Sequence, residues 1–233
     1  MNGQLYLIPA PIGANPTTNT LTPHGLEMVR QLRYFAVENA RSARRYLSAL
    51  GMPVPITELS VELVDKNTDV ASLPSILAPV LAGSSMGIIS EAGCPGIADP
   101  GALLVELAHA EGIEVIPLPG PSSILMALMA SGLNGQSFAF NGYLPIERGE
   151  RRHRLRELEG RATREGQTQA FIETPYRNDK LLEEILQSLR PATRLTIAYG
   201  IDTKGGWIRT RSVSDWRRAK PNLGKVPTVF AIL

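Results

Sequence analysis

Short apolar runs alternate with amphipathic segments along the whole chain, and this alternation limits the possible folds more than any other feature of the sequence. Short apolar runs bounded by turn residues are typical of buried strands, whereas apolar residues spaced three and four apart are typical of helices. Their alternation predicts βα units, and therefore an α/β protein with largely parallel sheets. The expected strands are residues 5–8, 34–37, 86–89, 113–117, 138–140, 168–172, 195–200 and 226–233. The expected helices are residues 25–32, 69–82, 103–110, 122–130, 150–161 and 179–190.

The length of the chain suits two compact domains. Its 233 residues exceed one average domain, and 43% of them are apolar, which is enough for a substantial core. We place the boundary near Leu118 and expect two α/β domains, residues 1–118 and 119–233, with mainly parallel and mixed sheets. The helix 122–130 is apolar on all sides, which predicts burial between layers, whereas the charged helix 150–161 should be exposed.

Cysteine and histidine usage excludes several kinds of site. Cys94 is the only cysteine, so no internal disulfide can form and a reducing compartment is expected. His24, His109 and His153 lack the spacing of metal ligands, so we predict no metal. The amino terminus has no basic run of the kind found in signal peptides, and the longest apolar run, residues 124–130, is too short to cross a bilayer. These features predict a soluble, cytoplasmic protein that does not enter a membrane.

Three loops rich in glycine and proline each follow an expected strand. They are residues 9–13 (PAPIG), 90–101 (SEAGCPGIADPG) and 117–123 (PLPGPSS). Ligands of open parallel sheets bind beyond the carboxyl ends of the strands, where glycine allows a close approach and proline fixes the loop shape. None of the loops contains GxGxxG or the GxxxxGK[ST] of a P-loop, which argues against dinucleotides and nucleoside triphosphates. Together the three loops predict a small-molecule site of another kind.

Six segments resemble a known family in their order and spacing. They are LYLIPAPIG, IISEAGCPGIADPG, VIPLPGPSS, ASGL, FNGYLP and FIETPYR. The chain from about Leu5 to Lys204 is thereby similar to the ribosomal RNA small subunit methyltransferase I family of the tetrapyrrole (corrin/porphyrin) methylase superfamily. The resemblance implies a homodimer in which S-adenosyl-L-methionine lies folded in the cleft between two α/β domains.

The resemblance also implies which residues contact S-adenosyl-L-methionine. The implied cofactor residues are Ile12 and Gly13 in the first loop, Ala92, Gly93, Cys94 and Ile97 in the second, Ser122 and Ser123 in the third, and Glu173 at a later strand end. Backbone N–H groups suit the methionine carboxylate, and an apolar slot suits adenine. Cys94 stands where the family usually has threonine. Since methyl transfer needs no thiol nucleophile, we interpret Cys94 as a small lining residue.

Three residues match segments that face the substrate in the family. Glu38 and Arg41 match a segment that usually reads EDTR, and Lys204 matches the lysine of an ELTK segment. We take these three as candidate catalytic residues. Arg41 can hold a phosphate through two hydrogen bonds, or Glu38 and Arg41 can pair or cap the next helix. The residues around these positions depart from the family, so the resemblance implies the cofactor more directly than the RNA substrate.

Two basic segments fit an anionic substrate. Residues 148–164 hold seven arginines against three glutamates, and residues 204–225 hold seven basic residues against one aspartate, although the net charge is only +2. Helical spacing brings Arg148, Arg151, Arg152 and Arg156 to one face, which would contact RNA phosphates or would simply be solvated. The leading interpretation is a methyltransferase acting on RNA, with the 2′-hydroxyl of a small-subunit rRNA cytidine as one acceptor. The alternatives are a methylase of a tetrapyrrole or another small acidic metabolite, and a non-catalytic RNA-binding factor that keeps the fold.

Overall fold

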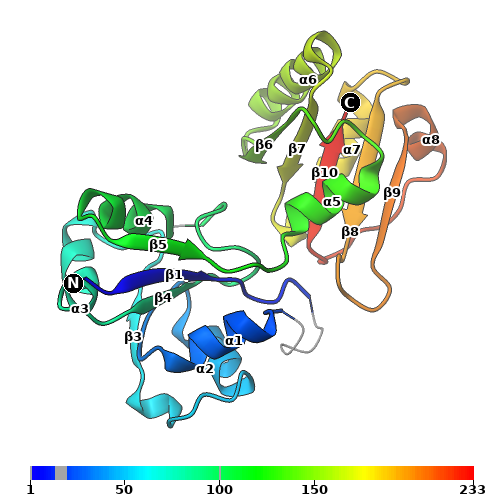
Figure 1. Ribbon diagram of the computed structural model, residues 1–233. Helices are drawn as coiled ribbons and strands as arrows, with labels where there is room; N and C mark the ends of the chain where they lie inside the picture. Colours follow the sequence, from blue (N-terminus) through cyan, green and yellow to red (C-terminus); the bar gives the residue numbers. More distant parts are fainter. Residues whose placement is uncertain (1, 14–19, 100) are drawn as a thin grey trace. The chain divides into compact units, whose positions relative to one another are not determined.

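The computed structural model describes residues 2–13, 20–99 and 101–233 of the chain (Figure 1). The chain forms two compact units, Met1–Ser122 and Ser123–Leu233, and each contains one five-stranded sheet. Among the described helices, none combines the length and apolarity that a membrane-spanning segment requires.

The sheet of the first unit is entirely parallel. Its strands lie in the order β3-β2-β4-β1-β5, and every neighbouring pair runs in the same direction. Because the strands are parallel, their carboxyl ends and the loops that follow lie at one edge of the sheet. The strands are β1 (Gln4–Ile8), β2 (Tyr34–Val37), β3 (Ser60–Leu63), β4 (Met86–Ile89) and β5 (Glu114–Pro117).

Helices cover both faces of this first sheet (Figure 1). The neighbouring residues Phe35 and Ala36 of β2 belong to two different apolar clusters, because successive side chains of a strand point to opposite faces. Val29 of α1 and Leu47 of α2 pack in the cluster with Phe35, and Leu77 of α3 packs in the other. The helices are α1 (Pro23–Gln31), α2 (Ala40–Ala49), α3 (Leu73–Leu81) and α4 (Gly101–Ala110), with short 3₁₀ turns at Ile56–Glu58 and Val70–Ser72.

The sheet of the second unit is mixed. Its order is β6-β7-β10-β8-β9, and only β6 and β7 are parallel, since β10 runs antiparallel to both neighbours and β9 runs antiparallel to β8. The five residues of the central strand β10 are all buried. The strands are β6 (Phe138–Tyr143), β7 (Thr168–Ile172), β8 (Arg194–Tyr199), β9 (Trp207–Ser212) and β10 (Thr228–Ile232).

The helices of the second unit divide between the two faces of its sheet. In Figure 1, α5 crosses in front of β10 and β8, and α7 lies behind the sheet. The larger apolar cluster gathers Leu155 of α6, Leu182 of α7 and Trp216 of α8 around Phe171 and Phe230. The helices are α5 (Ser123–Ser131), α6 (Arg148–Glu165), α7 (Asn178–Ser188) and α8 (Val213–Arg218), with a 3₁₀ turn at Pro175–Arg177.

The expected fold class, two α/β layers with parallel and mixed sheets, is confirmed. Each expected strand and helix is present within a few residues of its expected bounds. The apolar patterns did not predict β3 and β9, which lie at sheet edges and are only partly buried, nor α2 and α8.

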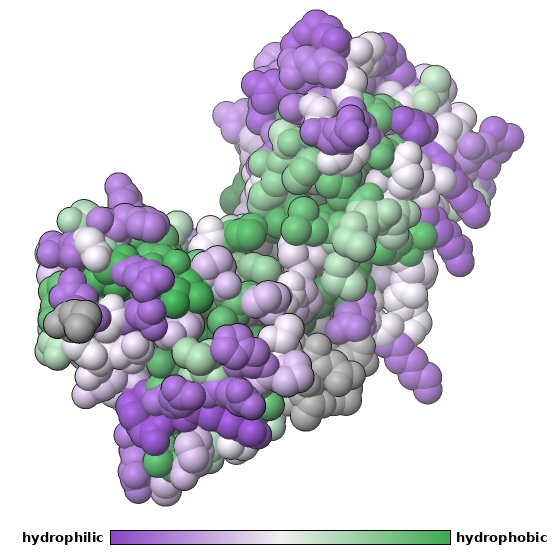
Figure 2. Space-filling view, in the orientation of Figure 1, coloured by the Kyte–Doolittle hydropathy of each residue, from purple (hydrophilic) through white to green (hydrophobic). Residues whose placement is uncertain are grey.

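The expectation that the helix 122–130 is buried between layers was wrong. The helix α5 buries Ala127 and Leu128 against the sheet, but Leu125 is 47% exposed and Met129 is 83% exposed. Figure 2 shows apolar residues gathered over α5 and the neighbouring part of the sheet. A helix that packs on one side of a sheet has only one face to bury, even when its residues are apolar on every side.

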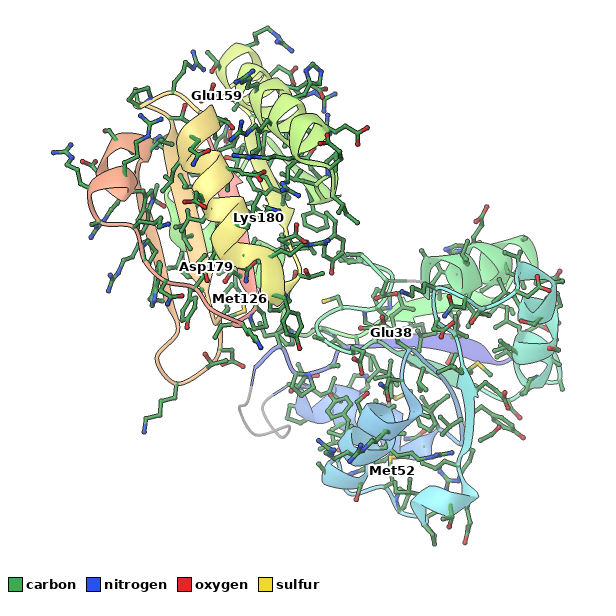
Figure 3. All side chains as sticks on the ribbon, turned by 180° about the vertical axis from the view of Figure 1, so that it is seen from behind. Glu38, Met52, Met126, Glu159, Asp179 and Lys180 are labelled. Carbon is green, nitrogen blue, oxygen red and sulfur yellow. The ribbon has the colours of Figure 1, made fainter. Side chains whose placement is uncertain are left out.

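The expectation that the charged helix is exposed, with its arginines on a free face, was also partly wrong. Within α6, Arg151 is 2% exposed and Glu159 is 7% exposed (Glu159 is labelled in Figure 3). The helix packs against α7 and β7. Arg151 pairs with Glu184 of α7, and Glu159 accepts the N–H of Arg190 in the loop that follows α7. Arg151 therefore cannot belong to a free phosphate-binding face.

Candidate functional site

The first, second and third loops meet at one edge of the first sheet. Here the first loop is residues 9–13, the second loop is residues 90–101, and the third loop is residues 117–122. They follow β1, β4 and β5, and β1 lies between the other two strands. Three loops at the carboxyl ends of adjacent parallel strands are the usual setting of a ligand site in this kind of sheet.

Backbone hydrogen bonds join the first loop to the second. The N–H of Ala10 donates to the carbonyl oxygen of Gly93 at 2.8 Å, and the N–H of Gly93 donates to that of Ala10 at 3.0 Å. Since both residues use both backbone groups in this pair, the spacing of the two loops is fixed.

Gly93 has a backbone conformation that favours glycine, with φ of +76°. A Cβ at this position would point between Ile12 and Pro121, 3.5 Å from Cγ2 of Ile12 and 3.7 Å from the oxygen of Pro121. Gly93 therefore brings residues of the first and third loops close to its own backbone. A side chain there would fill space at the junction of the three loops.

Cys94 extends the same junction. Its Sγ donates to the carbonyl oxygen of Pro121 at 3.3 Å, and burial raises the pKa of the thiol. A thiol with a raised pKa is protonated at neutral pH and is a poor nucleophile. Its chemistry agrees with a lining residue.

Gly120 sets the contact between the first and third loops. A Cβ on Gly120 would lie only 2.2 Å from Cβ of Pro9 and 2.4 Å from its Cγ. No side chain fits at this distance, so glycine is required for the two loops to pack.

Asp99 shapes the second loop from within. Its carboxylate accepts the N–H of Gly96 at 3.0 Å to each oxygen and the N–H of Gly101 at 2.7 Å. Burial raises the pKa of Asp99, and the backbone N–H groups of the loop lower it in part. The hydrogen bonds hold the turn after Gly93 in one shape.

A cavity of about 410 Å³ opens beside the first and second loops. Helix α2 supplies Arg45 and Tyr46 to its lining, and the loops supply Gly13 and Glu91. Its volume lies in the ordinary range of small-molecule sites. Of the residues implied to contact the cofactor, only Gly13 lines this cavity.

Tyr46 anchors the first loop to α2. Its hydroxyl donates to the carbonyl oxygen of Pro9 at 2.7 Å, the side chain is 6% exposed, and burial raises the pKa of the phenol strongly. Changing Tyr46 to phenylalanine leaves that carbonyl without its donor, and we expect a loss of about 1–3 kcal/mol in the free energy of unfolding. Urea denaturation of the wild type and of Tyr46→Phe measures this loss. Tyr143→Phe, at a tyrosine that is 56% exposed, is the control, and an equal effect of both changes would contradict the assignment.

Glu38 and Arg41 lie at the start of α2, but they neither pair with each other nor cap the helix. Glu38, at the end of β2 (labelled in Figure 3), accepts the N–H of Glu91 at 2.9 Å. Asn39 caps α2 by accepting the N–H groups of Arg41 at 2.9 Å and Ser42 at 3.3 Å. Asparagine and aspartate are comparable caps, so this departure from the family segment preserves the helix start. The side chain of Arg41 is exposed, and no ion pair among the described residues joins it to Glu38.

The remaining implied residues of the second loop differ in exposure. Ala92 and Ile97 are exposed, with Ile97 at 49%, and the N–H of Ile97 donates to the carbonyl oxygen of Cys94 at 3.4 Å. Ser122, at the end of the third loop, is half-buried. The loops thus combine buried backbone with apolar side chains left at the surface.

Glu173 is the implied residue of the second unit with the most distinctive surroundings. It follows β7 and is 4% exposed, and its Oε1 accepts the N–H of Thr174 at 2.7 Å and Nη2 of Arg177 at 2.7 Å. Its Oε2 is buried without a hydrogen-bond partner among the described residues. Burying a carboxylate oxygen unpaired is costly, and this oxygen is suited to accept a ligand hydroxyl.

The other two implied residues of the second unit are Ser123 and Lys204. Ser123 begins α5 and is half-buried, and Lys204 is exposed in the turn between β8 and β9. Two residues before Lys204, Asp202 has a φ of +61°, which is uncommon outside glycine.

Within residues 2–13, 20–99 and 101–233, no group of three or more histidine, cysteine or acidic side chains is placed to hold a metal ion.

Residues 4–204 match the model of a family described as Tetrapyrrole (Corrin/Porphyrin) Methylases. The chain belongs to this family. The tetrapyrrole methylase match covers all three loops, α2 and the end of β7, and it ends before β9.

Curated relatives of this tetrapyrrole methylase carry the name ribosomal RNA small subunit methyltransferase I. The protein of Xylella fastidiosa (strain Temecula1) is 33% identical over 78% of this chain and 63% of its own length. The protein of Vibrio cholerae is 31% identical over 83% and 63%, and that of Pseudomonas aeruginosa is 31% identical over 94% and 75%. The chain therefore spans less than two thirds of the length of the first two relatives.

Solved structures agree in fold. Uroporphyrin-III-C-methyltransferase from Thermus thermophilus superposes with a TM-score of 0.58 and 19% identity, covering 100% of this chain and 92% of that one. The methyltransferase CobJ superposes with a TM-score of 0.64 and 20% identity, covering 99% and 93%. At this identity the likeness establishes the fold alone.

The sequence patterns did not single out four residues that build the loop cluster, namely Tyr46, Glu91, Asp99 and Gly120. A signal existed for two of them. Asp99 lies between glycines in a loop, where aspartate often accepts backbone N–H groups, and Gly120 lies between two prolines. Tyr46 carried no signal, because its partner is the carbonyl of a residue 37 positions away.

Proposed function

We propose that this protein is an S-adenosyl-L-methionine-dependent methyltransferase. The observation that carries the proposal is the junction of three loops around Gly93, where glycine at positive φ places no side chain between Ile12 and Pro121. Membership of a methylase family supports the proposal, and so does the cavity beside the same loops.

The residues present fit this cofactor. Loop backbone at Ile12, Gly13, Ala92 and Cys94 would hold the methionine part. Gly93, whose N–H already donates to Ala10, would allow the cofactor to approach the loop closely. The exposed apolar side chain of Ile97 would cover the cofactor, Ser122 and Ser123 would donate hydrogen bonds, and the unpartnered Oε2 of Glu173 would accept one from a hydroxyl.

The chemistry asked of the protein is modest. The bound sulfonium would supply an already activated methyl group, so the chain has to orient an incoming nucleophile opposite the sulfur and exclude water. Glu38, Arg41 and Lys204 are the proposed substrate-side residues. Arg41 and Lys204 are exposed cations suited to phosphate groups.

We infer that the methyl acceptor is small-subunit rRNA, because the curated relatives carry that substrate in their name. The 2′-hydroxyl of a cytidine, a homodimeric assembly and a cytoplasmic location complete this proposal. A single cysteine with a protonated thiol suits a reducing compartment.

Two measurements test the proposal in order. S-adenosyl-L-methionine at a hundred times its dissociation constant should add about 2.7 kcal/mol to the free energy of unfolding, which a thermal-shift assay detects as a higher midpoint. Labelled methyl should then transfer to small ribosomal subunits purified from a strain that lacks the gene. ATP serves as the control ligand, because the loops lack a nucleoside triphosphate motif.

The outcomes separate the candidate functions. Absence of any shift with S-adenosyl-L-methionine would contradict the cofactor assignment. Binding with transfer to a tetrapyrrole and none to rRNA would favour the small-molecule alternative. Binding of both cofactor and rRNA without transfer would favour the non-catalytic RNA-binding factor.

A further inference from the structure

Two exposed arginines lie on one face of the edge strand β9. Arg209 and Arg211 are two positions apart, so their side chains point to the same side of the strand. Each guanidinium lies over an indole ring, with Cζ of Arg209 5.1 Å from the ring centroid of Trp207 and Cζ of Arg211 5.1 Å from that of Trp216. The two guanidinium groups therefore lie about one two-residue repeat apart along β9.

The rings below these arginines are fixed by packing. The rings of Tyr199 and Trp207 stack at 5.4 Å between centroids, and those of Trp207 and Trp216 lie 6.0 Å apart. Trp216 is 2% exposed, and its indole N–H donates to the carbonyl oxygen of Leu195 at 2.8 Å. Arginines that rest on immobile rings lose less side-chain freedom when they bind a ligand.

The positive charge of this edge is mostly unneutralised. Residues 204–225 hold seven cations and one carboxylate, Asp215. Asp215 already pairs with Arg218 at 2.9 Å, and its pKa is held below the usual range by the hydroxyl of Ser212, by Arg218 and by Arg211. In the part of the chain that the structure describes, no ion pair includes Arg209 or Arg211.

Two of the neighbouring cations have other partners. Lys220 lies 3.8 Å from Glu183 of α7, and Arg217 donates to the carbonyl oxygens of Leu186 and Leu189 at the end of that helix. On β9, Arg209 and Arg211 are therefore two arginines that stack on indole rings and form no ion pair among the described residues.

The chemistry of the edge selects among anionic partners. A guanidinium offers a planar fork of donors that matches a phosphate, and two forks in a row match successive phosphates of one strand. A lipid surface would require apolar side chains for insertion. Throughout residues 177–233, all of which the structure describes, no large apolar side chain is exposed.

We propose that Arg209 and Arg211, stacked on Trp207 and Trp216, form a surface that binds the phosphodiester backbone of the RNA substrate. The inference rests on the proposed function and assigns part of its substrate binding to residues beyond position 204, where the family match ends. It replaces α6 as the main phosphate-binding element, since Arg151 of that helix is buried.

The test compares two pairs of substitutions that remove the same charge. The variant Arg209→Gln/Arg211→Gln should bind small-subunit rRNA about 10- to 30-fold more weakly near 0.1 M salt, and the slope of log affinity against log salt should fall by about 1.4, or 0.7 for each lost phosphate contact. The control Arg156→Gln/Arg164→Gln changes two exposed arginines of α6 and should leave affinity and slope near those of the wild type. Affinity for S-adenosyl-L-methionine should be the same in all three proteins.

A second variant separates the effect of charge from that of the guanidinium geometry. Arg209→Lys/Arg211→Lys keeps both charges, so its salt slope should match that of the wild type although the forked geometry is lost. Equal thermal midpoints of these variants and the wild type show that the unit remains folded.

Several results would overturn the inference. If the wild type binds and methylates rRNA and the glutamine pair on β9 does so with unchanged affinity and slope, the arginines only protect an edge strand from pairing. Equal losses in the β9 and α6 variants would indicate nonspecific charge. A loss confined to anionic phosphatidylserine vesicles, with rRNA binding intact, would assign the edge to lipid. If the wild type neither binds nor methylates rRNA, the proposed function itself fails, and this surface assignment with it.

Discussion

Replacement of Arg151 by alanine should lower the free energy of unfolding by about 3–5 kcal/mol, the usual cost of breaking a buried ion pair from one side. Arg151 binds Glu184 through two hydrogen bonds, Nε to Oε2 at 2.6 Å and Nη2 to Oε1 at 2.8 Å. The two side chains are 2% and 3% exposed. Alanine would leave a buried carboxylate without its hydrogen-bonding partner, with only the exposed Arg148 3.8 Å away. Urea denaturation of the two proteins measures the difference.

The loss should extend beyond the pair itself. Nη1 of Arg151 also donates to the carbonyl oxygens of Pro145 at 3.1 Å and Ile146 at 2.8 Å, which lie in the segment between β6 and α6. Removing the guanidinium therefore leaves two backbone acceptors without their donor as well.

The pH dependence of the effect follows from the pair. The hydrogen bond from Arg151 is the main cause that lowers the pKa of Glu184. A carboxyl group whose pKa is lower in the folded state stabilises the protein above its unfolded pKa, and the contribution is lost as the pH falls through the folded value. The difference between the wild type and Arg151→Ala should thus be full near neutral pH and should shrink in acid.

Two controls make this prediction specific. Arg156→Ala removes an exposed arginine of the same helix and should change stability by no more than about 0.5 kcal/mol. The double change Arg151→Met/Glu184→Leu replaces both charges by apolar groups and should recover much of the loss. A single variant at Arg151 that unfolds like the wild type would show that the pair contributes nothing to the fold.

The same residue explains what the sequence pattern could not predict. Helical spacing correctly places Arg151 near Arg148 and Arg152 on α6, but burial is decided by what packs against the helix. The partner, Glu184, lies on α7, 33 positions further along the chain. A pattern within one helix contains no information about that pairing.

Strands were predictable for the opposite reason. The segments that form β1, β4 and β10 are apolar because these strands lie inside their sheets. A buried strand needs apolar residues, so its position can be recognised from the composition of the sequence. Strands β3 and β9 lie at sheet edges and keep polar or charged residues, so their sequences resemble loops.

The loop cluster was predictable in position and less so in detail. Parallel strands with loops rich in glycine and proline predicted a site at their carboxyl ends, and the structure brings the first, second and third loops together there. The contacts that fix the loops depend on residues such as Tyr46 and Asp99, whose partners are backbone groups. Any residue can supply a backbone carbonyl, so the type of residue at the partner position does not reveal such a contact.

Gly93 offers the most direct test of the cofactor site. Substitution by valine should weaken binding of S-adenosyl-L-methionine by at least about 100-fold, or roughly 2.7 kcal/mol. Two effects combine. A β-branched residue at a φ of +76° is strained, and its side chain would extend between Ile12 and Pro121, where the three loops meet. Isothermal titration calorimetry measures the change.

Gly112 provides the matched control, because it shares the backbone conformation without the neighbours. Its φ is +66°, a Cβ there would meet nothing within 4 Å, and it lies before β5, at the end of the sheet away from the loops. Gly112→Val should therefore show the same backbone strain in urea denaturation while binding the cofactor with unchanged affinity. If Gly93→Val is folded and binds as tightly as Gly112→Val, the space beside Gly93 is not part of the cofactor site. If both variants lose binding equally, the effect belongs to general destabilisation of the first unit rather than to the junction of the loops.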